Sequence, residues 1–250
     1  MLRKFKADLH IHTSLSPCAD EEMFPQSIIR QAKMNDLDIV GICDHNSAEN
    51  VVATKKIGQR EDIAVIGGIE ATSQEEVHIL ALFENVKELF KFQEIIYEKL
   101  SGFNDEKIFG KQLIINENNE VVGSNNRLLI GATSLSLQEI VQAIYSLGGL
   151  TIASHIDRES YSIIAQLGFI PEGLLLDALE LSPNYERKTV CVADRQVNPE
   201  LYGFSLVTFS DAHFLKDIGK SFTVFLMEEA TIGEIKKALS GEDGRKVMIG

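Results

Sequence analysis

The sequence predicts an α/β protein whose strands form a parallel barrel. Segments with the two-residue period of strands alternate with segments that have the longer period of helices, a pattern typical of parallel barrels and sheets. Seven or eight segments have strand character, which favours a barrel over a nucleotide-binding sheet. The chain also contains neither GxGxxG nor GxxxxGKS/T, the glycine-rich loops that cradle phosphates in such sheets.

Each predicted element has a local signal. Pro25 fits the first turn of a helix, Ser136 and Glu139 form a capping box, Gly148 ends the same helix, and Thr231 caps the last one. The predicted strands cover residues 5–13, 37–46, 63–72, 76–83, 150–157, 174–182, 204–213 and 221–227. The predicted helices cover residues 24–36, 47–62, 86–101, 136–149, 160–168 and 232–240.

One stretch interrupts this alternation. Residues 103–133 include the Asn-rich sequence KQLIINENNEVVGSNNRLLIG, which predicts a hairpin with ENNE at its turn. We therefore expect a single domain over residues 1–250, with an inserted cap at about 85–134. Long insertions over a barrel rim are usually functional, so the cap is expected to influence substrate choice.

Composition narrows the classes of function. The chain has 250 residues, 44% hydrophobic and 24% charged, with a net charge of −13. That charge disfavours long nucleic acids as partners, although a local basic pocket could still bind a short end. No apolar run is long enough for a membrane helix, and the N-terminal residues lack the apolar core of a signal peptide. Three widely spaced cysteines, Cys18, Cys43 and Cys191, form no disulfide framework, so a cytoplasmic location is expected.

The histidines carry the main functional signal. Five lie at or near the carboxyl ends of predicted strands, and one opens a strand. The carboxyl ends of barrel strands form the rim where sites are built. A single histidine there is more often a hydrogen-bonded structural residue, but six near carboxylates favour a metal site. The six are His10, His12, His45, His78, His155 and His213.

Strand phase indicates which side chains act together. A two-residue period places Asp8, His10 and His12 on one face, and it also pairs Asp211 with His213. One strand can then supply two ligands without distortion. Other acidic residues near the predicted site are Asp20, Asp44, Glu70 and Glu180.

Asp44 and His45 are adjacent and must point in opposite directions. We expect His45 to bind metal directly and Asp44 to support it through a neighbouring group. Imidazoles and carboxylates without a thiolate set suit zinc, manganese or iron. The number of carboxylates also suits a multinuclear site, because a carboxylate can bridge two cations.

In this order, the motifs DLHIHT, CDHN, GIE, VHILALF, SHID and SDAH resemble those of the PHP (polymerase and histidinol phosphatase) superfamily. The resemblance spans residues 7–213. It implies a distorted (β/α)7 barrel that hydrolyses phosphoesters with two or three divalent metal ions. The SPCAD sequence resembles the SDG branch of the superfamily, which includes small phosphatases and nucleotide or RNA-end phosphoesterases.

The resemblance also implies how the ligands are grouped. The first metal would be held by two histidines and two carboxylates, one carboxylate would bridge to the second metal, and the third would have its own set. The implied ligands are His10, His12, Glu70 and Asp211 for the first metal, Glu70, His78 and His155 for the second, and Asp20, His45 and His213 for the third.

The expected reaction is hydrolysis of a small phosphomonoester. A hydroxide bridging two metals would attack phosphorus in line, since bound water has a pKa near 7. Asp44 or a metal-bound water could protonate the leaving group. Arg158, just after SHID, is expected to bind the phosphate, and the alternative is a surface salt bridge with Asp157 or Glu159.

Three other functions remain open at this point. The first is a phosphodiesterase or exonuclease acting on nucleotides or RNA 5′ ends. The second is a non-catalytic metal-binding regulatory module, which the complete ligand set disfavours. The third is an amidohydrolase, which usually has a carbamylated lysine, and no lysine lies at a strand end near the predicted site.

Overall fold

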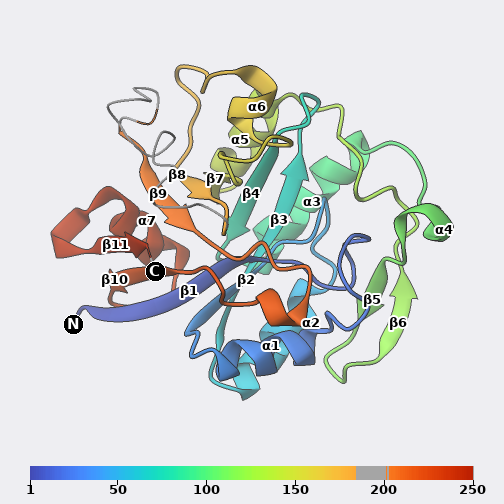
Figure 1. Cartoon of the computed structure of the whole chain (residues 1–250), viewed down its shortest axis with the longest axis horizontal. Coiled ribbons are helices and arrows are strands. Elements are labelled where there is room, and N and C mark those ends of the chain that lie inside the picture. The colour runs from blue at the N-terminus through green and yellow to red at the C-terminus, as the bar shows by residue number, and fades with distance from the viewer. Residues whose placement is uncertain (184–200, 202, 250) are drawn as a thin grey trace.

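All eight predicted strands lie in one curled sheet, seen in the computed structural model of residues 1–183, 201 and 203–249 (Figure 1). The sheet has nine strands in the order β11-β10-β1-β2-β3-β4-β7-β8-β9, and it makes a nearly closed barrel. Its strands are β1 (Arg3–Ile11), β2 (Ile39–Ile42), β3 (Ala64–Thr72), β4 (His78–Phe83), β7 (Leu150–Ala153), β8 (Ala178–Leu181), β9 (Ser205–Thr208), β10 (Thr223–Met227) and β11 (Lys246–Ile249).

The sequence predicted that all strands of the barrel would be parallel, but some are antiparallel. β4 is antiparallel to both β3 and β7, and β10 is antiparallel to β1 and β11. The physical reason for β4 is the short connection from Thr72 to His78, since a parallel pair needs a crossover of about a dozen residues or more. The barrel closes where the Thr223 hydroxyl bonds both the backbone N–H and the carbonyl of Thr208, each at 2.9 Å.

Helices cover the outside of this barrel (Figure 1). One buried apolar cluster packs α1, α2, α3 and α5 against the sheet, and a second joins side chains of the sheet to α7. The helices are α1 (Pro25–Met34), α2 (Val51–Arg60), α3 (Val86–Lys99), α4 (Glu106–Phe109), α5 (Leu137–Ser146), α6 (Ile163–Leu167) and α7 (Ile232–Ser240). The predicted capping box of α5 is confirmed, with Ser136 accepting from the Glu139 N–H.

The expected cap, at about residues 85–134, begins with α3. Leu89, Phe92 and Ile96 of this helix are fully buried in the main core. This helix therefore belongs to the barrel layer. The segment that stands apart follows Lys99 and includes α4, β5 (Leu113–Ile115) and β6 (Val121–Ser124) (Figure 1).

The predicted hairpin is present as β5 and β6. Its turn is closed by Asn116, whose backbone N–H donates to the Glu120 carbonyl and whose side chain accepts from the Glu120 N–H, both at 3.0 Å. The hairpin is fixed to the barrel rim because the Leu113 N–H donates to Ser14 and the Asn50 amide donates to Leu113. The cap therefore has a defined position beside the loop that follows β1.

A tight contact between β1 and β2 gives a first testable prediction. A Cβ added at Gly41 would overlap the carbonyl oxygen of Leu9 and lie 2.6 Å from its Cα. Gly41→Ala should cost about 3 kcal/mol, the upper end for overpacking, and lower the melting temperature by roughly 6–12 °C. Gly233→Ala in α7 is the matched control, since its Cβ would meet nothing within 4 Å. Equal melting temperatures for both variants would contradict this account of the strand pair.

Two further expectations concern cysteines and membranes. Cys43 is buried and Cys18 is exposed, and both are free thiols, whereas Cys191 lies outside the described residues. In the described part of the chain, no helix is both long and apolar enough to cross a bilayer.

Candidate metal centre

All six histidines converge at one rim of the barrel. His10 lies near the end of β1, and His45, His155 and His213 follow β2, β7 and β9. His78 opens β4, and because β4 runs antiparallel to its neighbours its start lies at the same rim. The apolar strands thus bring together residues that are far apart in the sequence.

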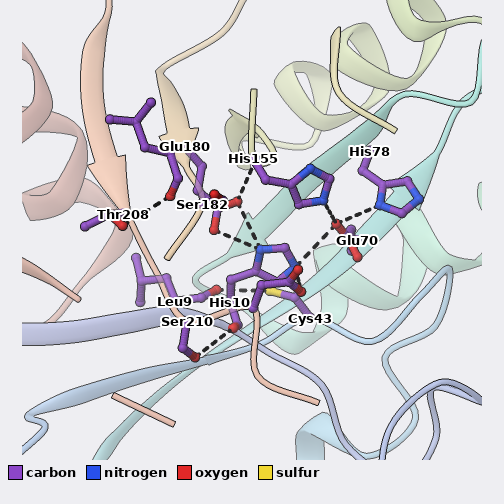
Figure 2. A network of polar contacts seen from close by, with 12 residues as sticks. Leu9, His10, Cys43, Glu70, His78, His155, Glu180, Ser182, Thr208 and Ser210 are labelled. Carbon is purple, nitrogen blue, oxygen red and sulfur yellow. Dashed lines mark hydrogen bonds and ion pairs between the residues drawn. The ribbon is translucent and has the colours of Figure 1, made fainter. Parts of the chain in front are cut away.

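Glu70 is the hub of the cluster (Figure 2). Its side chain is 1% exposed, and its two carboxylate oxygens face three and two imidazole nitrogens. A carboxylate surrounded in this way is placed to bridge cations, because it has about four lone-pair sites. The five facing nitrogens are those of His10 at 3.3 Å, His12 at 3.3 Å, His45 at 3.2 Å, His78 at 3.0 Å and His155 at 3.3 Å.

The ligand atoms form three overlapping groups, in each of which they lie within 4.8 Å of one another. The first contains the same four residues that the resemblance assigns to one metal. The second joins His45 to the Glu70–His78 pair, and His155 lies beside it. The groups are His10, His12, Glu70 and Asp211; His45, Glu70 and His78; and His12, His45 and His213.

Asp20 is absent from these groups of described residues. Its carboxylate accepts the Glu22 N–H at 2.8 Å, while its backbone N–H donates to the His213 carbonyl at 2.9 Å. The third group instead contains His12 with His45 and His213. A role for Asp20 in metal binding stays a prediction.

Asp8 also differs from the expected arrangement. The sequence period placed it on one face with His10 and His12, but the pairing of β1 with β2 shifts register between Asp8 and Ile11. Its carboxylate accepts the Ser210 and Gly219 N–H groups at 3.0 and 2.8 Å, and burial raises its pKa to about 6. Asp8 therefore anchors the segment that carries Asp211 and His213.

Two partners fix the orientation of the His10 and His12 rings. Glu180, whose role the sequence left open, places both carboxylate oxygens 3.0 Å from His10 Nδ1, so His10 Nε2 points toward Glu70 (Figure 2). Ser16 Oγ lies 2.9 Å from His12 Nδ1, which turns the other nitrogen of that ring into the cluster. Such contacts set the tautomer and direction of a metal-binding imidazole.

Asp44 supports the site indirectly. Its carboxylate is fully buried, accepts the Ser16 hydroxyl at 2.7 Å and accepts both the N–H and hydroxyl of Thr13. Ser16 in turn contacts His12 and the His45 N–H. Asp44 does not line the cavity formed by the described residues, so this geometry favours the positioning role over protonation of a leaving group.

Two histidines are held neutral by their surroundings. Burial lowers the pKa of His45 well below its ordinary value, the Glu70 carboxylate opposes this shift, and nearby imidazoles add to it. Burial also lowers the pKa of His213, to about 4. Neutral imidazoles have the free lone pair that a metal requires.

Neighbouring carboxylates shift the pKa values of His10 and His12 in the opposite direction. Burial opposes the charge on His12, but hydrogen bonds to Asp211 and Glu70 and their charges raise its pKa to about 9. Burial likewise opposes the charge on His10, and the carboxylates of Glu180, Asp211 and Glu70 hold its pKa well above the ordinary value. Metal binding must therefore displace protons from this pair.

The donor set fits a group of divalent cations. Imidazole and carboxylate ligands suit zinc, manganese or iron. Buried ligand atoms without a hydrogen bond in the described structure include Glu70 Oε1, His45 Nδ1 and His78 Nδ1. Buried polar atoms normally have partners, so these atoms fit bound cations as their partners.

A cavity of about 200 Å³ opens onto the cluster. Arg158 lines it with a 39% exposed side chain and pairs with Asp211 at 2.6 Å. The alternative was a surface salt bridge with Asp157 or Glu159, but among the described residues Arg158 pairs with Asp211, and Asp157 accepts the N–H and hydroxyl of Ser182. The guanidinium thus lies at the cluster, where a phosphate would enter.

Three other residues line this cavity without having been predicted. Cys18 and Tyr161 come from the loops after β1 and β7, and Ile130 comes from the cap. Asn46, next to His45, donates its amide to the carbonyls on both sides of Ile130, at Leu129 and Gly131. No sequence pattern indicates this contact between Asn46 and the cap, because it depends on where the cap loop lies in the folded chain.

The PHP domain family matches residues 8–158, more than half of the chain. An uncharacterized protein of Methanocaldococcus jannaschii is 37% identical over 90 residues, which cover 32% of this chain and 51% of that protein. A phosphoribosyl 1,2-cyclic phosphate 1,2-diphosphodiesterase of Eggerthella lenta is 30% identical over 80 residues, covering 30% of this chain and 29% of that protein.

The fold is similar to that of a solved lesion-specific endonuclease from Pyrococcus furiosus. The two have a TM-score of 0.76 and 21% identity, and the match covers 98% of this chain and 58% of that chain. The chain thus spans about half the length of the Methanocaldococcus jannaschii protein and 58% of the endonuclease chain.

Proposed function

Since the chain belongs to the PHP domain family, whose members include metal-dependent phosphoesterases, we propose that it hydrolyses a small phosphomonoester. The observation that supports this most is the buried Glu70 carboxylate, with five imidazole nitrogens within 3.3 Å, in a cluster that the partly exposed guanidinium of Arg158 joins through Asp211. Divalent metals bound there would lower the pKa of a water and neutralise charge on the phosphate.

The protein's own residues would hold and orient the reactants. Glu180 and Ser16 fix the two rings of His10 and His12, so the ligand nitrogens keep their direction when metals bind. Arg158 would bind two phosphate oxygens with its planar fork. A cavity of about 200 Å³ is smaller than typical ligand pockets of about 300–1,000 Å³, so only the phosphate end would enter.

A panel of phosphomonoesters and phosphodiesters, assayed with the full chain and added zinc, manganese or iron(II), tests this proposal. We expect the highest kcat/KM on a small monoester. Faster hydrolysis of diesters or of nucleic acid would replace it with the second function below, and no hydrolysis of any ester would support a regulatory metal-binding module.

A phosphodiesterase or nuclease is the second candidate. Two findings favour it: the fold similarity to a lesion-specific endonuclease, and the partial match to a diphosphodiesterase. The expected exclusion of long nucleic acids is thus not supported by the comparisons. The net charge of −13 still disfavours broad contact with a nucleic-acid backbone, and it favours recognition of a short segment at the cavity.

Arg158→Ala should lower kcat/KM on phosphoesters by about one to two decades. The reason is that a hydrogen bond to a charged group contributes roughly 1.5–3 kcal/mol. Arg158→Lys should recover only part of the loss, because it restores the charge but not the fork. Metal content, measured in parallel, should stay at the wild-type value. Lys220→Ala is the control, since Lys220 pairs with Asp217 away from the cavity. Wild-type kinetics for Arg158→Ala would exclude it from phosphate binding.

A further inference from the structure

The aromatic ring of Tyr161 forms part of the cavity wall. It stacks on the imidazole of His78, with ring centroids 4.6 Å apart and an interplanar angle of 21°. Tyr161 nevertheless remains 42% exposed and lines the same cavity as Glu70 and Arg158. Since one face of the ring rests on His78, the other face is available at the cavity mouth.

The backbone holds this ring in place at a conformational cost. Tyr161 has φ +58, a left-handed conformation that bulky residues rarely adopt. Its carbonyl accepts the His78 N–H at 2.9 Å, and the next residue, Ser162, donates to the Arg158 carbonyl at 2.7 Å and caps α6. Strained backbone of this kind clusters at active sites and ligand clamps.

We propose that Tyr161 is a specificity-determining residue that stacks on a planar ring in the substrate, next to its phosphate. The proposal rests on the proposed function and names the substrate class: a phosphoester whose organic part is a nucleobase-like ring system. The small cavity requires the organic part to lie at its mouth once the phosphate faces the histidines. The free face of Tyr161 and the partly buried Ile130 provide an apolar surface there.

Binding of AMP and of ribose 5-phosphate provides the test, because the two ligands share a 5′-phosphate and differ by one planar base. Isothermal titration calorimetry on the metal-loaded chain should show tighter binding of AMP to the wild type. Tyr161→Ala should weaken AMP binding by about 5- to 100-fold, as expected from base–aromatic stacking. Binding of ribose 5-phosphate should change by no more than about twofold.

Two further variants of Tyr161 distinguish the effect of aromatic stacking from the effect of side-chain volume. Tyr161→Phe keeps the aromatic face and should retain the preference for AMP, whereas Tyr161→Leu should lose it. Phe169→Ala is the matched control, because Phe169 is a 52% exposed aromatic that does not line this cavity. Metal content should be equal in all variants, since each keeps the Tyr161 carbonyl that accepts the His78 N–H.

Three results would overturn the proposal: equal affinity of the wild type for both ligands, equal weakening of both by Tyr161→Ala, or unchanged AMP binding in that variant. Turnover on the ester panel is read separately. A chain that binds AMP through Tyr161 but hydrolyses no ester would contradict the proposed function and leave the stacking intact. Hydrolysis of esters without a binding preference for the base would contradict the stacking and leave the proposed function intact.

Discussion

Glu70→Gln should lower kcat on the best phosphoester by at least about 100-fold. Changes to residues that only support metal ligands already cost 10- to 100-fold, and Glu70 itself contacts five of the ring nitrogens. Glutamine keeps the volume of the side chain but removes the negative charge that two cations would share. Steady-state kinetics with saturating metal would measure the loss.

Glu117→Gln provides the control for this charge change. Glu117 lies in the cap, pairs with Lys56 at 2.6 Å, and is remote from the cluster. Its variant should keep wild-type turnover. If Glu70→Gln also kept wild-type turnover, a carboxylate bridging metals would have no place in the reaction.

Replacing Glu180 should produce the second large effect. Its carboxylate faces His10 Nδ1 with both oxygens at 3.0 Å and is fully buried. Glu180→Gln keeps an acceptor and should cost about 10-fold in activity, while Glu180→Leu removes the acceptor and should cost about 100-fold. The same order is expected in the rate at which a chelator removes metal from the two variants.

The loss of activity and the rate of metal removal, compared between the two variants, decide whether Glu180 acts through His10. A merely structural role would appear as a fall in melting temperature with unchanged metal release. Wild-type activity and metal retention in Glu180→Leu would show that the His10 ring keeps its orientation without this partner.

Much of the barrel could be predicted from the sequence, because period and capping are local signals. The strand from Ala64 to Thr72, the capping box at Ser136 and the hairpin around Asn116 all follow from neighbouring residues. The parallel direction expected for the strands is wrong for β4, because the short connection from Thr72 to His78 allows only an antiparallel pair. The burial of α3 depends on contacts with the sheet, which no local period encodes.

For the site, the sequence revealed which residues gather at the rim but not how they are supported. Strand ends predicted that the histidines and nearby carboxylates would gather at one rim, and His45 Nδ1 lies 3.2 Å from Glu70 Oε2. The contact of Glu180 with His10 spans 170 residues, and the ring of Tyr161 depends on a left-handed loop residue. The side chain of Asp8 does not share a face with His10 and His12, because the pairing of β1 with β2 shifts register between Asp8 and Ile11. Such features arise from tertiary geometry.

Metal content of the chain tests the central claim most directly. Elemental analysis of wild-type protein, purified without chelator and compared with Glu70→Gln, would count the ions per chain. The three overlapping ligand groups predict two or three zinc, manganese or iron ions in the wild type and fewer in the variant. Less than one metal ion per wild-type chain would contradict the account.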